Sequence, residues 1–128
     1  MAIRIDKFIE GIPYPKDKPR GDTKAAKMWT QVVIDATRGI PKVRGRVSLN
    51  LKFVLPEDKY PKDHPYGPDL DNLLKRFFDA LCDTILSEVE GKDGAIVRLT
   101  VSKRQARKNE LTGVRMILSE IQTKAHQI

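Results

Sequence analysis

The chain has 128 residues, a formal net charge of +7 and a sequence pI of about 9.6. Its length suits one domain over residues 1–128, and no apolar run reaches the roughly 18 residues that a membrane span needs. Its single cysteine, Cys82, excludes an intramolecular disulfide and a zinc site built on paired cysteines. The N-terminus lacks the apolar stretch of a signal peptide, so we expect a cytoplasmic protein. The positive charge favours a polyanionic partner, most commonly nucleic acid.

Three elements are predicted in the first half of the chain. Alternating hydropathy predicts a strand over residues 2–10. A proline-rich loop follows, and an apolar stripe at helical spacing then predicts a helix over about residues 22–38. The clearest strand covers residues 46–55, because every second residue from Val47 to Leu55 is apolar.

The second half begins with another proline-rich loop. A helix is predicted from about Asp71 to Leu86, followed by strands over about residues 95–104 and 114–121. We expect the polar turn between these last two strands to join them as a hairpin. The order strand, helix, strand, helix, strand, strand predicts an α+β domain, with a mixed sheet of about four strands and two main helices packed on it.

Acidic residues gather where the second helix is predicted to begin. Asp69 and Asp71 would point about 200° apart in a helix but to the same side of an extended segment. Pro68 disfavours helix before it, so both carboxylates can converge at a helix start, where the helix dipole favours negative charge. Lys75 follows Asp71 by four residues and lies on the same helical face.

Asp93 comes from a later turn, just before the strand at residues 95–104. If that strand pairs near the start of the second helix, Asp93 joins Asp69, Asp71 and the Lys75 ammonium at one spot. Hard oxygen ligands in this number suit Mg²⁺ or Mn²⁺ rather than zinc. Water activated by such an ion can supply the nucleophile for phosphodiester hydrolysis without a histidine base.

Each of these residues also has an ordinary structural explanation. Asp69 or Asp71 could be an N-cap, and Lys75 could form exposed ion pairs with Asp71 and Asp79. Asp93 precedes a glycine, which is a common turn sequence. Spacing alone does not separate a metal site from these structural roles.

The chain contains the stretch Asp69-Leu70-Asp71-Asn72-Leu73-Leu74-Lys75, then Asp79-Ala80-Leu81, then Asp93 before a Val-rich strand. This pattern resembles the motif of the RusA family of Holliday junction resolvases. The resemblance covers most of the chain in outline and residues 68–101 in recognisable motif. It implies a Mg²⁺-dependent endodeoxyribonuclease of recombination and repair. Such an enzyme works as a homodimer and cuts four-way junctions by paired nicks.

The resemblance also implies roles for particular residues. Asp69, Asp71 and Asp93 correspond to the family's metal ligands, and Lys75 corresponds to its catalytic lysine. Asp79 matches a motif position whose role stays open. Relatives often carry two adjacent acids at the third site, often followed by a small residue and Gln. Here Asp93 alone is available, which leaves the number of metal ions open.

Basic residues lie at loop ends that could flank the acidic site. We predict phosphate contacts from two groups: Lys16, Lys18 and Arg20 on the first loop, and Lys103, Arg104, Arg107 and Lys108 around the turn between the last two strands. The alternative is that these charged turns only keep the domain soluble. Two other functions compete with a junction resolvase, namely a less selective flap or fork nuclease and a nucleic-acid-binding module without catalysis.

Overall fold

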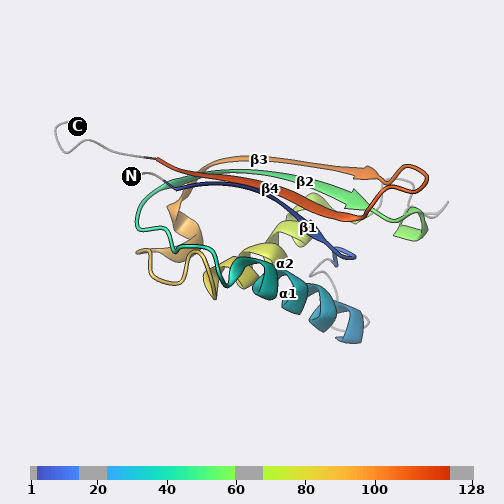
Figure 1. Ribbon diagram of the computed structural model, residues 1–128, viewed down its shortest axis with the longest axis horizontal. Helices are drawn as coiled ribbons and strands as arrows, with labels where there is room; N and C mark the ends of the chain where they lie inside the picture. Colours follow the sequence, from blue (N-terminus) through green and yellow to red (C-terminus); the bar gives the residue numbers. More distant parts are fainter. Residues whose placement is uncertain (1–2, 15–22, 60–67, 122–128) are drawn as a thin grey trace.

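The computed structural model describes residues 3–14, 23–59 and 68–121 (Figure 1). Its elements in chain order are β1 (Arg4–Glu10), α1 (Thr23–Thr37), β2 (Val47–Leu55), the short 3₁₀ helix η1 (Glu57–Lys59), α2 (Leu70–Cys82), a second 3₁₀ helix η2 (Lys92–Ala95), β3 (Ile96–Gln105) and β4 (Gly113–Glu120). The predicted α+β class and the order of strands and helices are confirmed. In the described part of the chain, neither α-helix is long and apolar enough to cross a bilayer.

The second helix is shorter than its apolar pattern predicts. It ends at Cys82, and Asp83 is its C-cap, whereas the prediction extended it to Leu86. Ile85 and Leu86 are fully buried, but they lie in the turn that follows the helix. An apolar residue satisfies the core equally well from a turn, so the pattern could not distinguish the two.

The sheet has four strands in the order β1-β4-β2-β3. β4 runs antiparallel to both of its neighbours, and β3 runs parallel to β2. The predicted hairpin between the last two strands is therefore wrong, because β2 separates them. Burial explains the difference: β4 buries Val114, Met116 and Leu118 and suits the centre of the sheet, whereas β3 is largely exposed and forms an edge.

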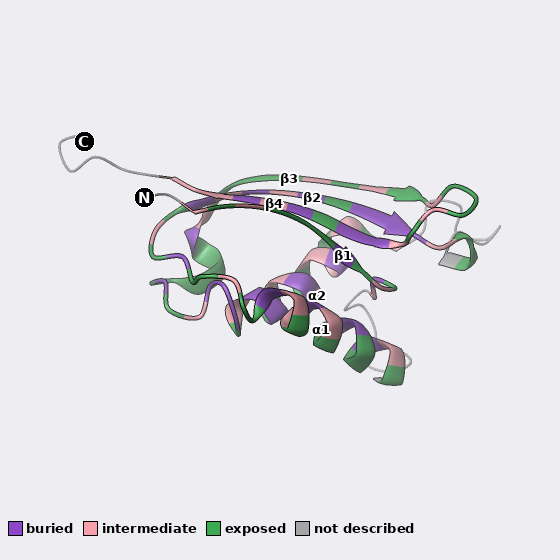
Figure 2. Ribbon diagram, in the orientation of Figure 1, coloured by how far each residue is buried: buried purple, intermediate pink, exposed green. Residues whose placement is uncertain are grey.

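Both helices pack on one face of this sheet (Figure 1). The core lies between the two layers, where Figure 2 shows the buried residues gathered. Trp29 and Val33 enter it from α1, and Leu73 and Phe77 enter it from α2. The Phe77 ring meets Phe53 of β2 edge to face, with 6.2 Å between the ring centroids. This packing fixes α2 against the sheet and so sets where its two ends lie.

The other face of the sheet carries no helix among the described residues (Figure 1). Side chains in register across it are mostly polar or charged. One row, for example, runs from Phe8 through Arg115 to Lys52. Successive residues of a strand point to opposite faces, so each strand supplies both the core and this open surface.

Candidate active site and nucleic-acid interface

Asp69 and Asp71 lie at the N-terminal end of α2, as their spacing predicts. Asp69 is the N-cap, with an extended backbone at φ −65° and ψ 141°. Its carbonyl accepts the first helical hydrogen bond, from the Leu73 N–H at 3.1 Å, but its carboxylate makes no capping hydrogen bond. Both carboxylates belong to exposed residues. Asp69 therefore contributes to the start of the helix through its backbone carbonyl, and its carboxylate does not cap the helix.

Lys75 lies one turn further along the same face of α2. Its ammonium is 3.9 Å from a carboxylate oxygen of Asp71, and both side chains are well exposed, at 61% and 71%. An exposed i,i+4 pair of this kind contributes at most a few tenths of a kcal/mol to stability. The ion pair between Lys75 and Asp71 therefore contributes little to the stability of the fold. Asp79 is also exposed, one more turn along the helix.

Lys103 connects the end of β3 to the start of α2. It is paired in register with the buried Phe53, so it lies on the helix side of the sheet. Its ammonium donates a hydrogen bond to the carbonyl of Pro68, at 2.6 Å. That carbonyl belongs to the peptide bond just before Asp69. The C-terminal end of β3 and the N-terminal end of α2 are thus neighbours.

Asp93 lies in η2, at the opposite end of α2. Burial raises the pKa of the Cys82 thiol, the nearby Asp93 carboxylate adds to this shift, and a backbone hydrogen bond from Asp93 opposes it. Asp93 is therefore a direct neighbour of Cys82, the last residue of α2. Cys82 follows Asp71 by eleven residues, and at 1.5 Å per residue the helix separates the two by about 16 Å.

The three predicted ligands consequently do not meet within the single chain. Among the described residues, no group of three or more His, Cys, Asp or Glu side chains is placed to hold a metal ion. The prediction assumed that β3 begins near the start of α2. Instead β3 begins beside the C-terminal end of α2 and runs back, so that Lys103 near its end lies beside the N-terminal end (Figure 1).

A family model described as endodeoxyribonuclease RusA matches residues 11–116, which is most of the chain. The chain belongs to the RusA endodeoxyribonuclease family. It is accordingly a Holliday-junction-resolving endonuclease, and a DNA junction is its substrate. The match spans both ends of α2 and hence all four of the predicted site residues. No individual curated protein is significantly similar to the chain in sequence.

The basic residues predicted to hold DNA in this RusA-family enzyme differ from one another in their surroundings. Lys16, Lys18 and Arg20 lie outside the described residues. Arg104 makes a two-pronged ion pair with Glu110, whose carboxylate also accepts the Arg107 backbone N–H at 2.8 Å. The Arg104 hydrogen bond is the main cause that lowers the pKa of Glu110 to about 2. Arg107 and Lys108 are exposed at the turn that follows β3.

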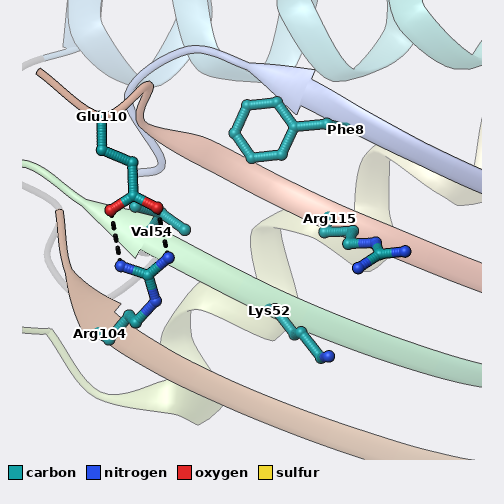
Figure 3. A pocket seen from close by; sticks show the side chains of 6 residues that line it. All are labelled: Phe8, Lys52, Val54, Arg104, Glu110 and Arg115. Atoms are coloured by element: carbon teal, nitrogen blue, oxygen red, sulfur yellow. Dashed lines mark hydrogen bonds and ion pairs between the residues drawn. The ribbon is translucent and has the colours of Figure 1, made fainter. Parts of the chain in front are cut away.

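Arg104 also borders a hollow of about 400 Å³ on the open face of the sheet (Figure 3). The other residues that line the hollow are Phe8, Lys52, Val54, Glu110 and Arg115. Arg115 is held by Asp6, with one nitrogen–oxygen distance of 2.8 Å. This surface could not be predicted from the sequence, since its residues come from all four strands and from the loop between β3 and β4. No local pattern shows that these strands become neighbours.

Proposed function

We propose that this RusA-family enzyme is a Mg²⁺-dependent homodimer that resolves four-way junctions by paired nicks, in recombination and repair. The observation that carries the proposal is the start of α2, where Asp69 and Asp71 are exposed and Asp69 makes no capping hydrogen bond. Carboxylate oxygens are the donors that Mg²⁺ and Mn²⁺ prefer. The helix dipole at this end also favours the negative charge that would hold a cation.

The separation of Asp93 from this pair supports a site shared between two copies. Asp93 lies beside the C-terminal end of α2, where the helix dipole disfavours a carboxylate. A cation and a neighbouring chain would offset that cost. In the proposed site, Asp69 and Asp71 of one copy and Asp93 of the other hold the ion. Two-fold symmetry then produces two such sites from one interface.

The exposed edge of β3 is the surface that fits this arrangement best. β3 pairs with β2 along one edge, and among the described residues nothing pairs with its other edge. Val97 and Leu99 on this strand are large apolar residues that stay 52% and 41% exposed. If two β3 edges met antiparallel, the start of each strand, with Asp93, would lie by the end of the other. That end adjoins Asp69.

The chain's own residues then have distinct roles in the reaction. When bound, Mg²⁺ supplies a Lewis acid beside the reacting phosphate and makes water a stronger nucleophile. Lys75, one turn from the two carboxylates, donates charge-assisted hydrogen bonds to the oxygens of that phosphate. Arg107 and Lys108 hold more distant phosphates of the junction arms.

A cleavage assay tests the reaction directly. The purified protein is mixed with a labelled four-way junction, and Mg²⁺ is titrated, with duplex, flap and fork DNA as controls. We expect paired, symmetrical nicks in the junction that require the metal. Equal cutting of flaps and forks would favour the less selective nuclease. Binding without any cutting would favour the module that lacks catalysis.

A subunit-mixing experiment tests the shared site. Asp71→Asn and Asp93→Asn chains should each be inactive alone, but a mixed dimer would contain one site with all its carboxylates. Random mixing should therefore restore about a quarter of the wild-type sites. If each site lies within one chain, mixing restores nothing. Wild type mixed with Asp71→Asn should give dimers that nick one strand, and light scattering that shows a monomer free and on DNA would contradict the dimer.

A further inference from the structure

Lys103 differs from the basic residues around it in where it lies. Its neighbour Arg104 points to the open face of the sheet and pairs with Glu110. Lys103 points to the helix side and is half-buried. Its hydrogen bond to the Pro68 carbonyl joins residues 35 positions apart in sequence. It therefore faces the protein, whereas the sequence suggested that it faces DNA.

The position of this lysine makes its charge unusual. It shares a row of the sheet with Phe53, a fully buried core residue. An apolar side chain would cover that part of the core without the cost of removing an ammonium group from water. The contact with Pro68 supplies the reason for a charged donor here, because a hydrogen bond from a charged group is stronger than one between neutral groups.

Two hydrogen bonds then hold the backbone on either side of Asp69. Lys103 binds the carbonyl of the peptide before it, and the Leu73 N–H binds the carbonyl of Asp69 itself. With both peptides held, the direction of the bond from Cα to the side chain of Asp69 is fixed. The carboxylate makes no capping hydrogen bond that would turn it back to the helix.

We propose that Lys103 is a positioning residue for the metal site, an inference that rests on the proposed function. It orients Asp69 through the Pro68 carbonyl. Its positive charge also offsets the repulsion between the carboxylates of Asp69 and Asp71 before an ion binds. Groups that orient metal ligands in this way typically change metal affinity or activity about 10- to 100-fold when they are removed.

Two variants and one control test this role. Lys103→Met keeps the length of the side chain and removes the donor, and Lys103→Arg keeps both the charge and the donor. Lys52→Met is the matched control, an exposed lysine on the open face of the neighbouring strand β2. Four quantities are measured for each: Mn²⁺ binding by electron paramagnetic resonance without DNA, the Mg²⁺ concentration for half-maximal cleavage, metal-free junction affinity against salt, and thermal unfolding.

We expect Lys103→Met to weaken Mn²⁺ binding about 10- to 100-fold, with a matching rise in the Mg²⁺ requirement. Its metal-free junction affinity and salt slope should equal those of the wild type. Lys103→Arg should recover most of the metal binding, and Lys52→Met should change neither metal measurement.

Other outcomes would overturn the inference. Wild-type metal binding by Lys103→Met would show that the contact positions nothing. A weaker metal-free affinity whose salt slope falls by about one unit would identify Lys103 as a phosphate contact instead. If Lys103→Met does not fold, a Lys103→Arg protein that folds but does not bind Mn²⁺ normally decides against the role. If the wild type cuts no junction, the proposed function fails, while the Mn²⁺ measurements still decide the role of Lys103.

Discussion

The two ends of α2 differ in how they are supported. At the N-terminal end, the helix dipole favours the two carboxylates and Lys103 anchors the incoming chain. At the C-terminal end, Asp93 lies in a 3₁₀ turn that follows Gly91, a glycine in the left-handed region at φ 79°, and it contacts the last residue of the helix. The first end is held by contacts within one chain, while the carboxylate at the second end acquires a role only in the proposed dimer.

This difference shows that residues of one motif need not meet within one chain. α2 separates Asp69 and Asp71 at its N-terminal end from Asp93 beside its C-terminal end. A rigid helix thus keeps Asp93 away from Asp69 and Asp71 within one chain. In the proposed shared site, dimer formation would therefore be a condition for activity.

The carboxylates at the two ends should be equally necessary. Asp71→Asn and Asp93→Asn should each lower junction cleavage by at least about 100-fold, since in the proposed site each removes a ligand of the same ion. Junction binding should stay intact or tighten, because a negative charge that repels phosphate is lost. Single-turnover cleavage and gel-shift titrations measure the two effects. Normal cleavage by Asp93→Asn would confine the site to the N-terminal end.

Removal of Lys75 should affect chemistry without affecting the fold. Lys75→Ala should slow cleavage about 100- to 1,000-fold, because the proposed site loses its cation beside the reacting phosphate. Its melting temperature should match the wild type, since the pair with Asp71 is exposed. Cleavage rates and thermal unfolding, measured on the same preparation, separate the two. A variant that unfolds early but cuts normally would show a structural ion pair.

The salt dependence of junction binding should distinguish the exposed Arg107 and Lys108 from Lys103. Arg107→Gln and Lys108→Gln should each reduce the slope of log affinity against log salt by about one unit, as expected when one phosphate contact is lost. Lys103→Met should leave the slope unchanged. Fluorescence anisotropy over a range of salt concentrations measures these slopes. A slope that neither turn variant alters would leave Arg107 and Lys108 as solvated residues of a loop.

The smallest effect is expected where Glu110 holds Arg104. The pKa of Glu110 is lowered from 4.5 to about 2, chiefly by its hydrogen bond with Arg104. The contribution of the pair to stability is therefore complete above pH 4.5 and is lost as the pH falls towards 2. Glu110→Gln should remove this acid-dependent component from unfolding curves. At neutral pH it should also tighten junction binding a few-fold if the released Arg104 reaches a phosphate. Unchanged binding would exclude Arg104 as a contact.

Local rules were sufficient to predict the order of the main strands and helices and the place of Asp69, Asp71 and Lys75 at the start of α2. Alternation from Val47 to Leu55 predicted β2, and the spacing of Asp69, Asp71 and Lys75 predicted a helix start with its charges on one side. Such features depend on neighbours within a few residues, and the periods of strand and helix are the same in every fold.

The tertiary structure alone decided which distant residues become neighbours. It placed β4 between β1 and β2, it turned Lys103 towards Pro68, and it put Asp93 at the far end of α2. Strand order follows from which strands have a neighbouring strand at both edges, and that depends on the packing of the whole core around Phe53 and Phe77. A sequence pattern with a period of two or 3.6 residues carries no information on that choice, because it is the same for a central strand and for its neighbour at the edge.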